Sequence, residues 1–250
     1  MKNLKIHHSY VLFVCLTIVV GVHHLPDIAW AKEAYVLTTV AGSSATYAGE
    51  EVVREAYRRI GHNIVVQRID GKKALEQSNQ GLVDAELARI DGISRVYQNL
   101  IQVPIPINYY QGVAFSKKYN FPIKGWSSLK PYHIGIVKGI IFAKQGTQGM
   151  NVTVADTYAQ LIDLLKNSKI DVAVMPRING LVALKNAEAD GIKEMEGVLE
   201  TLFTYHYVNI KNKSLVPKLE KVLKDMLLKG TTREIQAKVY QKLLSGDPSP

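Results

Sequence analysis

Apolar runs of strand length alternate with helical patterns along the first part of the chain. The runs have the length of buried strands, and the stretches between them place apolar residues on one helical face, as at Ala48, Val52 and Ala56. The predicted strands cover residues 35–40, 64–69, 83–88 and 100–104, and the predicted helices cover residues 48–60, 72–80 and 93–99. This alternation predicts βαβ units, with a parallel sheet and helices on its faces.

The alternation stops at residues 108–117, a long extended stretch without a helix, and then begins again. The second series has predicted strands at residues 133–137, 152–155 and 170–175, followed respectively by a short helix, a helix capped by Asp156, and a helix at residues 181–186. A strand at residues 202–210 and helices at residues 215–228 and 232–244 end the chain. The two series predict two α/β lobes.

Residues 1–31 have the features of a secretory signal peptide. Lys2 and Lys5 supply a positive start, residues 11–22 form an apolar run, and Ala29-Trp30-Ala31 places small residues where a signal peptidase reads them. A membrane-spanning helix needs roughly 20 apolar residues, so this run is too short for an anchor. We therefore expect cleavage after Ala31 and a periplasmic protein.

Cleavage would change the chemistry that the chain offers. The sequence has one cysteine, Cys15, so residues 32–250 have no thiolate. Their histidines, His62, His133 and His206, lack the spacing of a metal site, and we expect neither a metal nor a cofactor. With 29 Lys and Arg against 21 Asp and Glu, these residues carry a charge of +8. The positive side chains are interspersed with acids, which indicates a solvated surface and no nucleic-acid partner.

Two segments of the chain repeat one pattern. Residues 83–92 read VDAELARIDG, and residues 170–180 read IDVAVMPRING. In each, an aspartate opens a buried strand, and Arg-Ile-(Asp/Asn)-Gly follows where the strand gives way to a helix. The repeat predicts Arg89 and Arg177 at facing strand ends of two similar lobes, where open α/β sheets bind ligands.

The order and spacing of several segments resemble the type II periplasmic solute-binding proteins, in the group that serves polar amino acid ABC transporters. The resemblance covers residues 33–244. It rests on GLVDA at residues 81–85, HIGIVKG at 133–139, YVNIK at 207–211, LVPKL at 215–219 and LKGT at 228–231. It implies an α/β clamshell in which each lobe is a mainly parallel sheet with helices on both faces. Lobe 1 would comprise residues 32–110 plus 198–250, and lobe 2 residues 111–197.

The resemblance also implies a ligand in the cleft, held through its α-carboxylate by an arginine in a T-x-x-R-like segment after the third strand. The corresponding segment here is Gly92-Ile93-Ser94-Arg95, which makes Arg95 a candidate, while Arg89 lies nearer the strand end. Both remain open. Arginine suits this role because its planar guanidinium donates two parallel, charge-assisted hydrogen bonds to a carboxylate.

Further candidates surround these arginines. Glu86, on the strand of Arg89, either binds a ligand ammonium or neutralises Arg89. Ser43 and Ser44 lie between the first strand and the first helix, where they either flank an anion site or cap the helix. Three tyrosines either wall the cleft or pack between the lobes, and a glycine closes the HIGIVKG segment. These last candidates are Tyr47, Tyr109, Tyr110 and Gly139.

Together these features predict a non-catalytic, secreted solute-binding protein. We expect it to capture a small polar, carboxylate-bearing solute such as an amino acid and to deliver it to the permease of an ABC transporter. A ligand-sensing module for a membrane receptor is the alternative, because only the recognition surface differs. A dehydratase-like enzyme on the same fold is a third hypothesis. The loop Gly42-Ser43-Ser44-Ala45-Thr46 lacks the second glycine of a serine-hydrolase Gly-x-Ser-x-Gly elbow.

Overall fold

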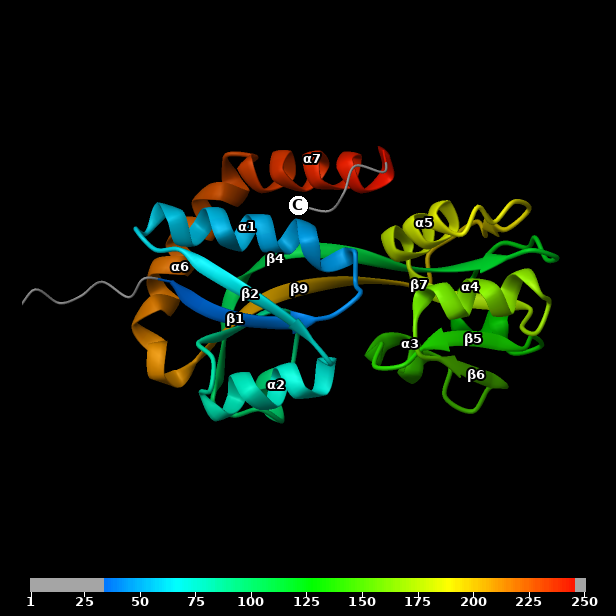
Figure 1. The fold of residues 1–250 in the computed structure, drawn as a ribbon, viewed down its shortest axis with the longest axis horizontal. Coiled ribbons are helices and arrows are strands. Elements are labelled where there is room, and N and C mark those ends of the chain that lie inside the picture. The colour runs from blue at the N-terminus through cyan, green and yellow to red at the C-terminus, as the bar shows by residue number, and fades with distance from the viewer. Residues whose placement is uncertain (1–33, 246–250) are drawn as a thin grey trace, which may run out of the picture. The chain divides into compact units, whose positions relative to one another are not determined.

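The computed structural model describes residues 34–245, which begin with alternating strands and helices as predicted. The predicted signal peptide, residues 1–31, lies outside the described residues. The first elements are β1 (Tyr35–Val40), α1 (Ala45–Arg59), β2 (Ile64–Ile69), α2 (Gly71–Gln80) and β3 (Ala85–Ile90). β1 pairs in parallel with β2 and with β3. Helices α1 and α2 lie on opposite sides of these strands (Figure 1).

Local signals set both ends of α2. At its start, the carboxylate of Asp70 accepts hydrogen bonds from the backbone N–H groups of Lys72 (3.0 Å) and Lys73 (3.1 Å). At its end, Gly81 adopts a left-handed conformation with φ of +75°, which glycine reaches without a steric penalty. The chain is thereby returned to the sheet as β3.

The second series of elements repeats this arrangement. It consists of β5 (Ile134–Val137), α3 (Ile141–Gly146), β6 (Val152–Ala155), α4 (Tyr158–Lys166), β7 (Val172–Pro176) and α5 (Arg177–Asn186). β5 pairs in parallel with β6 and with β7, just as β1 pairs with β2 and β3. We call β1–β3 with their helices the first lobe, and β5–β7 with α3–α5 the second lobe.

Two long antiparallel strands, β4 (Leu100–Ser116) and β9 (Glu200–Asn209), run between the two series. β9 pairs with β3 and β4 pairs with β7, so the sheet order is β2-β1-β3-β9-β4-β7-β5-β6, with the short β8 (Lys193–Glu194) beside the end of β4. The separate strand at residues 100–104 and extended stretch at residues 108–117 are thus one strand. Within this strand, Pro104 and Pro106 lie where the register of pairing shifts, and such irregularities tolerate a missing N–H.

Two further local predictions were wrong. Residues 93–99 do not form a helix, because only Ile93–Arg95 make a short 3-10 turn before β4 begins. Asp156 does not cap α4, because the hydroxyl of the next residue, Thr157, accepts the hydrogen bond from the N–H of Gln160 at 3.1 Å. The described chain also has 3-10 turns at Trp126–Leu129 and Ile210–Leu215, and ends with α6 (Val216–Leu228) and α7 (Thr231–Ser245).

Hydrophobic cores lie on both sides of the shared strands. In the first lobe, Tyr57, Leu87 and Ile107 are fully buried between the sheet, α1 and α6. In the second lobe, Phe115 and Leu161 belong to a core under α4. Because β4 contributes to both lobes, the described residues belong to one compact unit. None of the helices within residues 34–245 has the length and apolar content to cross a membrane.

Candidate ligand-binding site

A cleft of about 890 Å³ opens between the two lobes. The first lobe lines it with residues that follow β1 and β2 and with the end of β3, and the second lobe lines it with residues that follow β5 and β6. A smaller pocket of about 80 Å³ shares part of this lining, including Ser43, Arg89 and Gly139. The cleft therefore lies at the carboxyl ends of parallel strands, where open α/β sheets bind their ligands.

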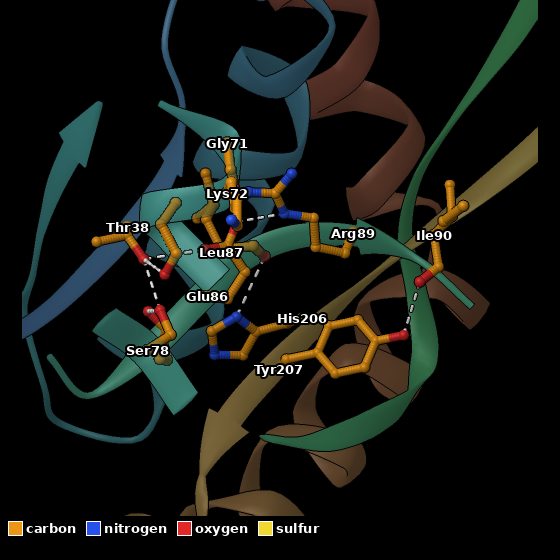
Figure 2. Close-up of polar contacts among 12 residues, drawn as sticks. Thr38, Gly71, Lys72, Ser78, Glu86, Leu87, Arg89, Ile90, His206 and Tyr207 are labelled. Atoms are coloured by element: carbon orange, nitrogen blue, oxygen red, sulfur yellow. Dashed lines mark hydrogen bonds and ion pairs between the residues drawn. The ribbon is translucent and has the colours of Figure 1, made fainter. Parts of the chain in front are cut away.

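Arg89, in β3, lines both the cleft and the smaller pocket. Two hydrogen bonds within the first lobe orient its side chain. Nε donates to the carboxylate of Glu86 at 2.8 Å, and Nη2 donates to the carbonyl oxygen of Gly71 at 2.9 Å (Figure 2). Among the described residues, Nη1 has no acceptor. The guanidinium is therefore fixed in orientation and retains donors for a ligand, although Arg89 is only 8% exposed.

Glu86 is turned into the first lobe and is fully buried. Its carboxylate accepts from Arg89 and, at 2.9 Å, from the hydroxyl of Thr38, which lies 2.6 Å from the hydroxyl of Ser78 (Figure 2). Burial raises the pKa of Glu86 to about 7, against the opposing effect of Arg89 and the two hydroxyls. Of the two roles considered for Glu86, the structure shows the pairing with Arg89 and does not place Glu86 in the lining of the cleft.

Arg177 does not line the cleft and does not face Arg89 across it. Its Nε donates to Glu194 at 2.8 Å, and its Nη1 contacts the side-chain oxygen of Gln111. The second segment of the repeat contains one extra residue, Pro176, which ends β7, so that Arg177 is the first residue of α5. Arg89 instead lies within β3, and the two arginines of the repeat are therefore not equivalent. Arg95 is exposed in the turn after β3 and is also absent from the lining.

The two serines after β1 have different places. Ser43 lines the cleft, whereas Ser44 precedes α1 without a side-chain capping bond. The first free N–H of α1, that of Ala45, instead donates to the side-chain oxygen of Asn179 at 3.2 Å, and the Asn179 amide lies 3.4 Å from the Ser43 hydroxyl. Asn179 belongs to α5, so a residue of the second lobe caps a helix of the first.

Of the remaining candidates, two line the cleft or the smaller pocket and two do not. Tyr110 lines the smaller pocket and packs against Phe142, with 5.9 Å between ring centroids. Gly139, with a left-handed φ of +82°, lines both the cleft and the pocket. Tyr47 lies under the guanidinium of Arg68, and Tyr109 is 48% exposed beside Phe203. Neither of these last two tyrosines lines the cleft.

The cleft contains charged residues that the sequence analysis did not single out. Lys72 from the first lobe and two lysines from the second join Arg89, against the acids Asp70 and Asp156. Asp70 is engaged at the start of α2, and the backbone N–H groups of Lys73 and Lys72 hold its pKa below the usual value, with a smaller effect from Lys138 of the second lobe. The two lysines of the second lobe are Lys138 and Lys144. Positive charge therefore predominates on both walls.

A second missed group is Tyr158, the first residue of α4, which lines the cleft from the second lobe. Sequence signals for these residues exist. Lys138 belongs to the HIGIVKG segment, Asn179 belongs to the Arg-Ile-Asn-Gly repeat, and Tyr158 lies three residues after a predicted strand end. Between residues 34 and 245, no three His, Cys, Asp or Glu side chains are grouped as a metal ion would require.

The arrangement of the two lobes matches solved structures of ligand-binding domains. The ligand-binding core of GluR0 in complex with L-glutamate aligns with a TM-score of 0.73 and 11% identity, over 83% of this chain and 98% of that one. This chain has the type II periplasmic-binding-protein fold. A histidine kinase sensor domain with similarity to periplasmic binding proteins has the same fold, with a TM-score of 0.69 and 15% identity over 82% of this chain and 95% of the domain.

The likeness extends to amino-acid-binding members of the periplasmic-binding-protein fold. An ancestral arginine-binding protein bound to arginine aligns with a TM-score of 0.67 and 18% identity, over 83% of this chain and 98% of that one. An uncharacterized protein of Shewanella oneidensis is 23% identical over 188 residues, which are 72% of this chain and 71% of that protein. No protein-family model matches the chain. The predicted fold class is thus confirmed, as is the resemblance at the level of fold.

Proposed function

We propose that this protein is a secreted, non-catalytic binding protein that captures a small carboxylate-bearing solute, such as an amino acid, in the cleft. The observation that carries the proposal is Arg89. Its guanidinium lines the cleft at the end of β3, is oriented by Glu86 and Gly71, and keeps Nη1 available. A guanidinium held in this way suits a carboxylate, because the ligand does not have to order a mobile side chain.

Binding would draw on both lobes. We propose the lobes as residues 32–110 plus 198–250 and residues 111–197, with β4 and β9 as the connection that bends. A ligand that touches Arg89 and the wall formed after β5 and β6 stabilises the closed arrangement of such a hinge. Small-angle scattering with and without ligand should then show a smaller radius of gyration for the liganded protein.

The proposed destination of the ligand is the permease of an ABC transporter in the inner membrane. The resemblance of the sequence to transporter-associated proteins supports this destination. The sensor domain among the structural neighbours favours a second candidate, presentation of the bound ligand to a membrane receptor. Uptake of labelled ligand by cells with and without the gene separates the two, because a sensor does not change uptake directly.

The proposal of secretion has a direct test. Cleavage after Ala31 predicts that protein isolated from the periplasm begins at Lys32, which amino-terminal sequencing would detect. Retention of Met1 in the soluble periplasmic protein would contradict it.

The binding test is a thermal-shift screen over amino acids and small carboxylates, followed by calorimetric titration. A ligand at 100 times its dissociation constant stabilises the protein by about 2.7 kcal/mol. The same screen with Arg89→Ala is the control, since shifts that survive this change do not arise at the proposed site. Absence of any shift with the wild-type protein across the carboxylates would contradict the proposed function.

A further inference from the structure

Tyr158 presents a buried hydroxyl to the cleft from the second lobe. The hydroxyl oxygen is inaccessible to solvent and has no hydrogen-bond partner within residues 34–245. Ser43 of the first lobe lies close enough to lower the pKa of Tyr158 slightly, but the two oxygens do not have the geometry of a hydrogen bond. Leaving a buried hydroxyl unsatisfied is unfavourable, because the group has given up its hydrogen bonds to water without gaining others. Such a group in a binding cleft is accounted for if a ligand provides its partner.

The chemistry of the phenol restricts that partner. Burial raises the pKa of Tyr158 well above its usual value, and the nearby Tyr110 raises it further. Tyr158 is therefore a neutral O–H donor throughout the physiological pH range. Its natural partner is an acceptor such as a carboxylate or carbonyl oxygen.

Tyr158 and Arg89 belong to one cluster of donors. Ser43 and Arg89 line both the cleft and the smaller pocket, and Tyr110 lines the smaller pocket. Tyr110 interacts electrostatically with both Arg89 and Tyr158. Burial raises the pKa of Tyr110 to about 12, and the charge of Arg89 opposes this shift. Tyr110 in turn raises the pKa of Tyr158. The carboxylate that pairs with Arg89, that of Glu86, is turned into the lobe. A ligand here meets hydrogen-bond donors from both lobes.

We propose that Tyr158 is a ligand-binding residue of the second lobe, whose O–H donates to a second acceptor oxygen of a ligand that Arg89 holds by its carboxylate. The inference rests on the proposed function, because it assigns the second contact of the same site. It also names the ligand class. A ligand with oxygen acceptors at both ends fits these donors, and the cations Lys72, Lys138 and Lys144 favour a net negative charge. The simplest such compounds are short dicarboxylates.

The test compares Tyr158→Phe with Tyr57→Phe, using succinate, 2-oxoglutarate, glutamate and arginine as probes. Removal of the Tyr158 hydroxyl leaves the ring and breaks no bond within the described protein. Without ligand, Tyr158→Phe should therefore unfold at the wild-type temperature or slightly above it. Its dissociation constant for the best dicarboxylate should rise about tenfold or more, the effect of a lost hydrogen bond to a charged group.

The control removes a hydroxyl that has a partner. Tyr57 is buried in the first lobe, and its hydroxyl lies 3.0 Å from Nε2 of His206. Tyr57→Phe should therefore lower the unfolding temperature and leave the dissociation constant unchanged. The opposite pattern for Tyr158→Phe, with reduced stability and unchanged affinity, would assign Tyr158 a structural role and overturn the inference.

The outcomes separate the inference from the function on which it rests. If the wild-type protein binds a probe and Tyr158→Phe binds it equally well, the Tyr158 contact is wrong while the binding function stands. If arginine binds more tightly than the dicarboxylates, the ligand class is wrong. If the wild-type protein binds none of the probes and no other carboxylate, both proposals fail.

Discussion

Asp84 and Asp171 make the same pair of hydrogen bonds in the two lobes. The Asp84 N–H donates to the carbonyl of Val36 at 2.8 Å, and its carboxylate accepts from the Val36 N–H at 2.8 Å. The Asp171 N–H donates to the carbonyl of His133 at 2.8 Å, and its carboxylate accepts from the His133 N–H at 2.9 Å. Each aspartate fastens the start of the first strand of its lobe. The repeat in the sequence is therefore a structural repeat at its aspartates, though not at its arginines.

Replacing either aspartate by alanine should reduce the free energy of unfolding, because a backbone N–H loses its acceptor. We expect about 1–3 kcal/mol for Asp84→Ala and less for Asp171→Ala, since only Asp84 is fully buried. Asp84 also bonds to Asn212 and pairs with Lys211. Urea denaturation of both variants measures the difference. A larger loss of unfolding free energy for Asp171→Ala would show that burial does not determine how much each aspartate contributes.

Arg89→Ala should weaken binding of a carboxylate ligand by roughly 2–5 kcal/mol, because it leaves a desolvated charge without its partner. Arg89→Lys should not restore full affinity, since an ammonium cannot supply two parallel hydrogen bonds. Calorimetric titration measures both, with Arg95→Ala as the matched control on the neighbouring exposed arginine. Loss of affinity in Arg95→Ala alone would transfer the carboxylate site to Arg95.

Glu86→Gln should make binding less dependent on pH. Ionised Glu86 offsets the charge of Arg89, so the affinity of the wild-type protein for a carboxylate should fall as pH rises through about 7, the pKa of Glu86. Glutamine keeps an acceptor for Arg89 but does not titrate. Titrations at pH 6 and pH 8, taken about one unit to each side of that pKa, should give unequal affinities for the wild type and similar ones for the variant. Equal pH dependence in both proteins would exclude Glu86 as the group responsible.

The same residue affects stability with a definite sign. The pKa of Glu86 is raised by burial from 4.5 to about 7, so its contribution to stability is present below pH 4.5 and is lost as pH rises through about 7. Burial lowers the pKa of His206 from 6.5 to about 4, which has the opposite effect: stability rises with pH over that interval. In the wild type the two trends offset each other between pH 4.5 and 6.5. Thermal unfolding of Glu86→Gln across this range should reveal the rising trend of His206 alone.

Asn179→Ala should destabilise the contact between the lobes. Asn179 is 2% exposed, and its loss leaves the N–H of Ala45 at the start of α1 without an acceptor. We expect a loss of about 0.5–2 kcal/mol, the usual cost of removing a helix cap. Asn179→Asp is the control, because it keeps the acceptor for Ala45; it removes the donor to Ser43 and adds a negative charge, which the N-terminus of α1 favours. Comparable unfolding free energies for wild type and Asn179→Ala would show that this cap does not contribute.

The sequence was informative where one local pattern determines the structure. The first strand, at residues 35–40, and the end of α2 at Gly81 follow from apolar runs and a helix-ending glycine. Where several segments meet, the sequence was less informative. The continuity of β4 across Pro104 and Pro106 depends on β9, which lies about 100 residues further along. The capping of Ala45 by Asn179 depends on the other lobe.

The candidate site shows the same division. The placement of Arg89 and Gly139 in the cleft lining could be predicted, because both lie at or just after strand ends that the apolar runs of the sequence reveal. Arg177 does not line the cleft, because β7 ends at the inserted Pro176 and Arg177 belongs to α5. Tyr158 was missed because its distinguishing property, a buried hydroxyl without a partner, exists only in the folded protein.

The continuity of β4 bears on how specificity in this molecule can be engineered. Leu199, just before β9, and Leu202, within β9, pack in the core of the second lobe. Val103 and Ile107 of β4 pack in the core of the first lobe. Grafting a whole lobe from another protein would therefore cut strands that both cores share. The turns after β1, β5 and β6 carry much of the cleft lining and lie outside β4 and β9. Exchange of these turns leaves the common scaffold intact and is the more conservative route to a new ligand.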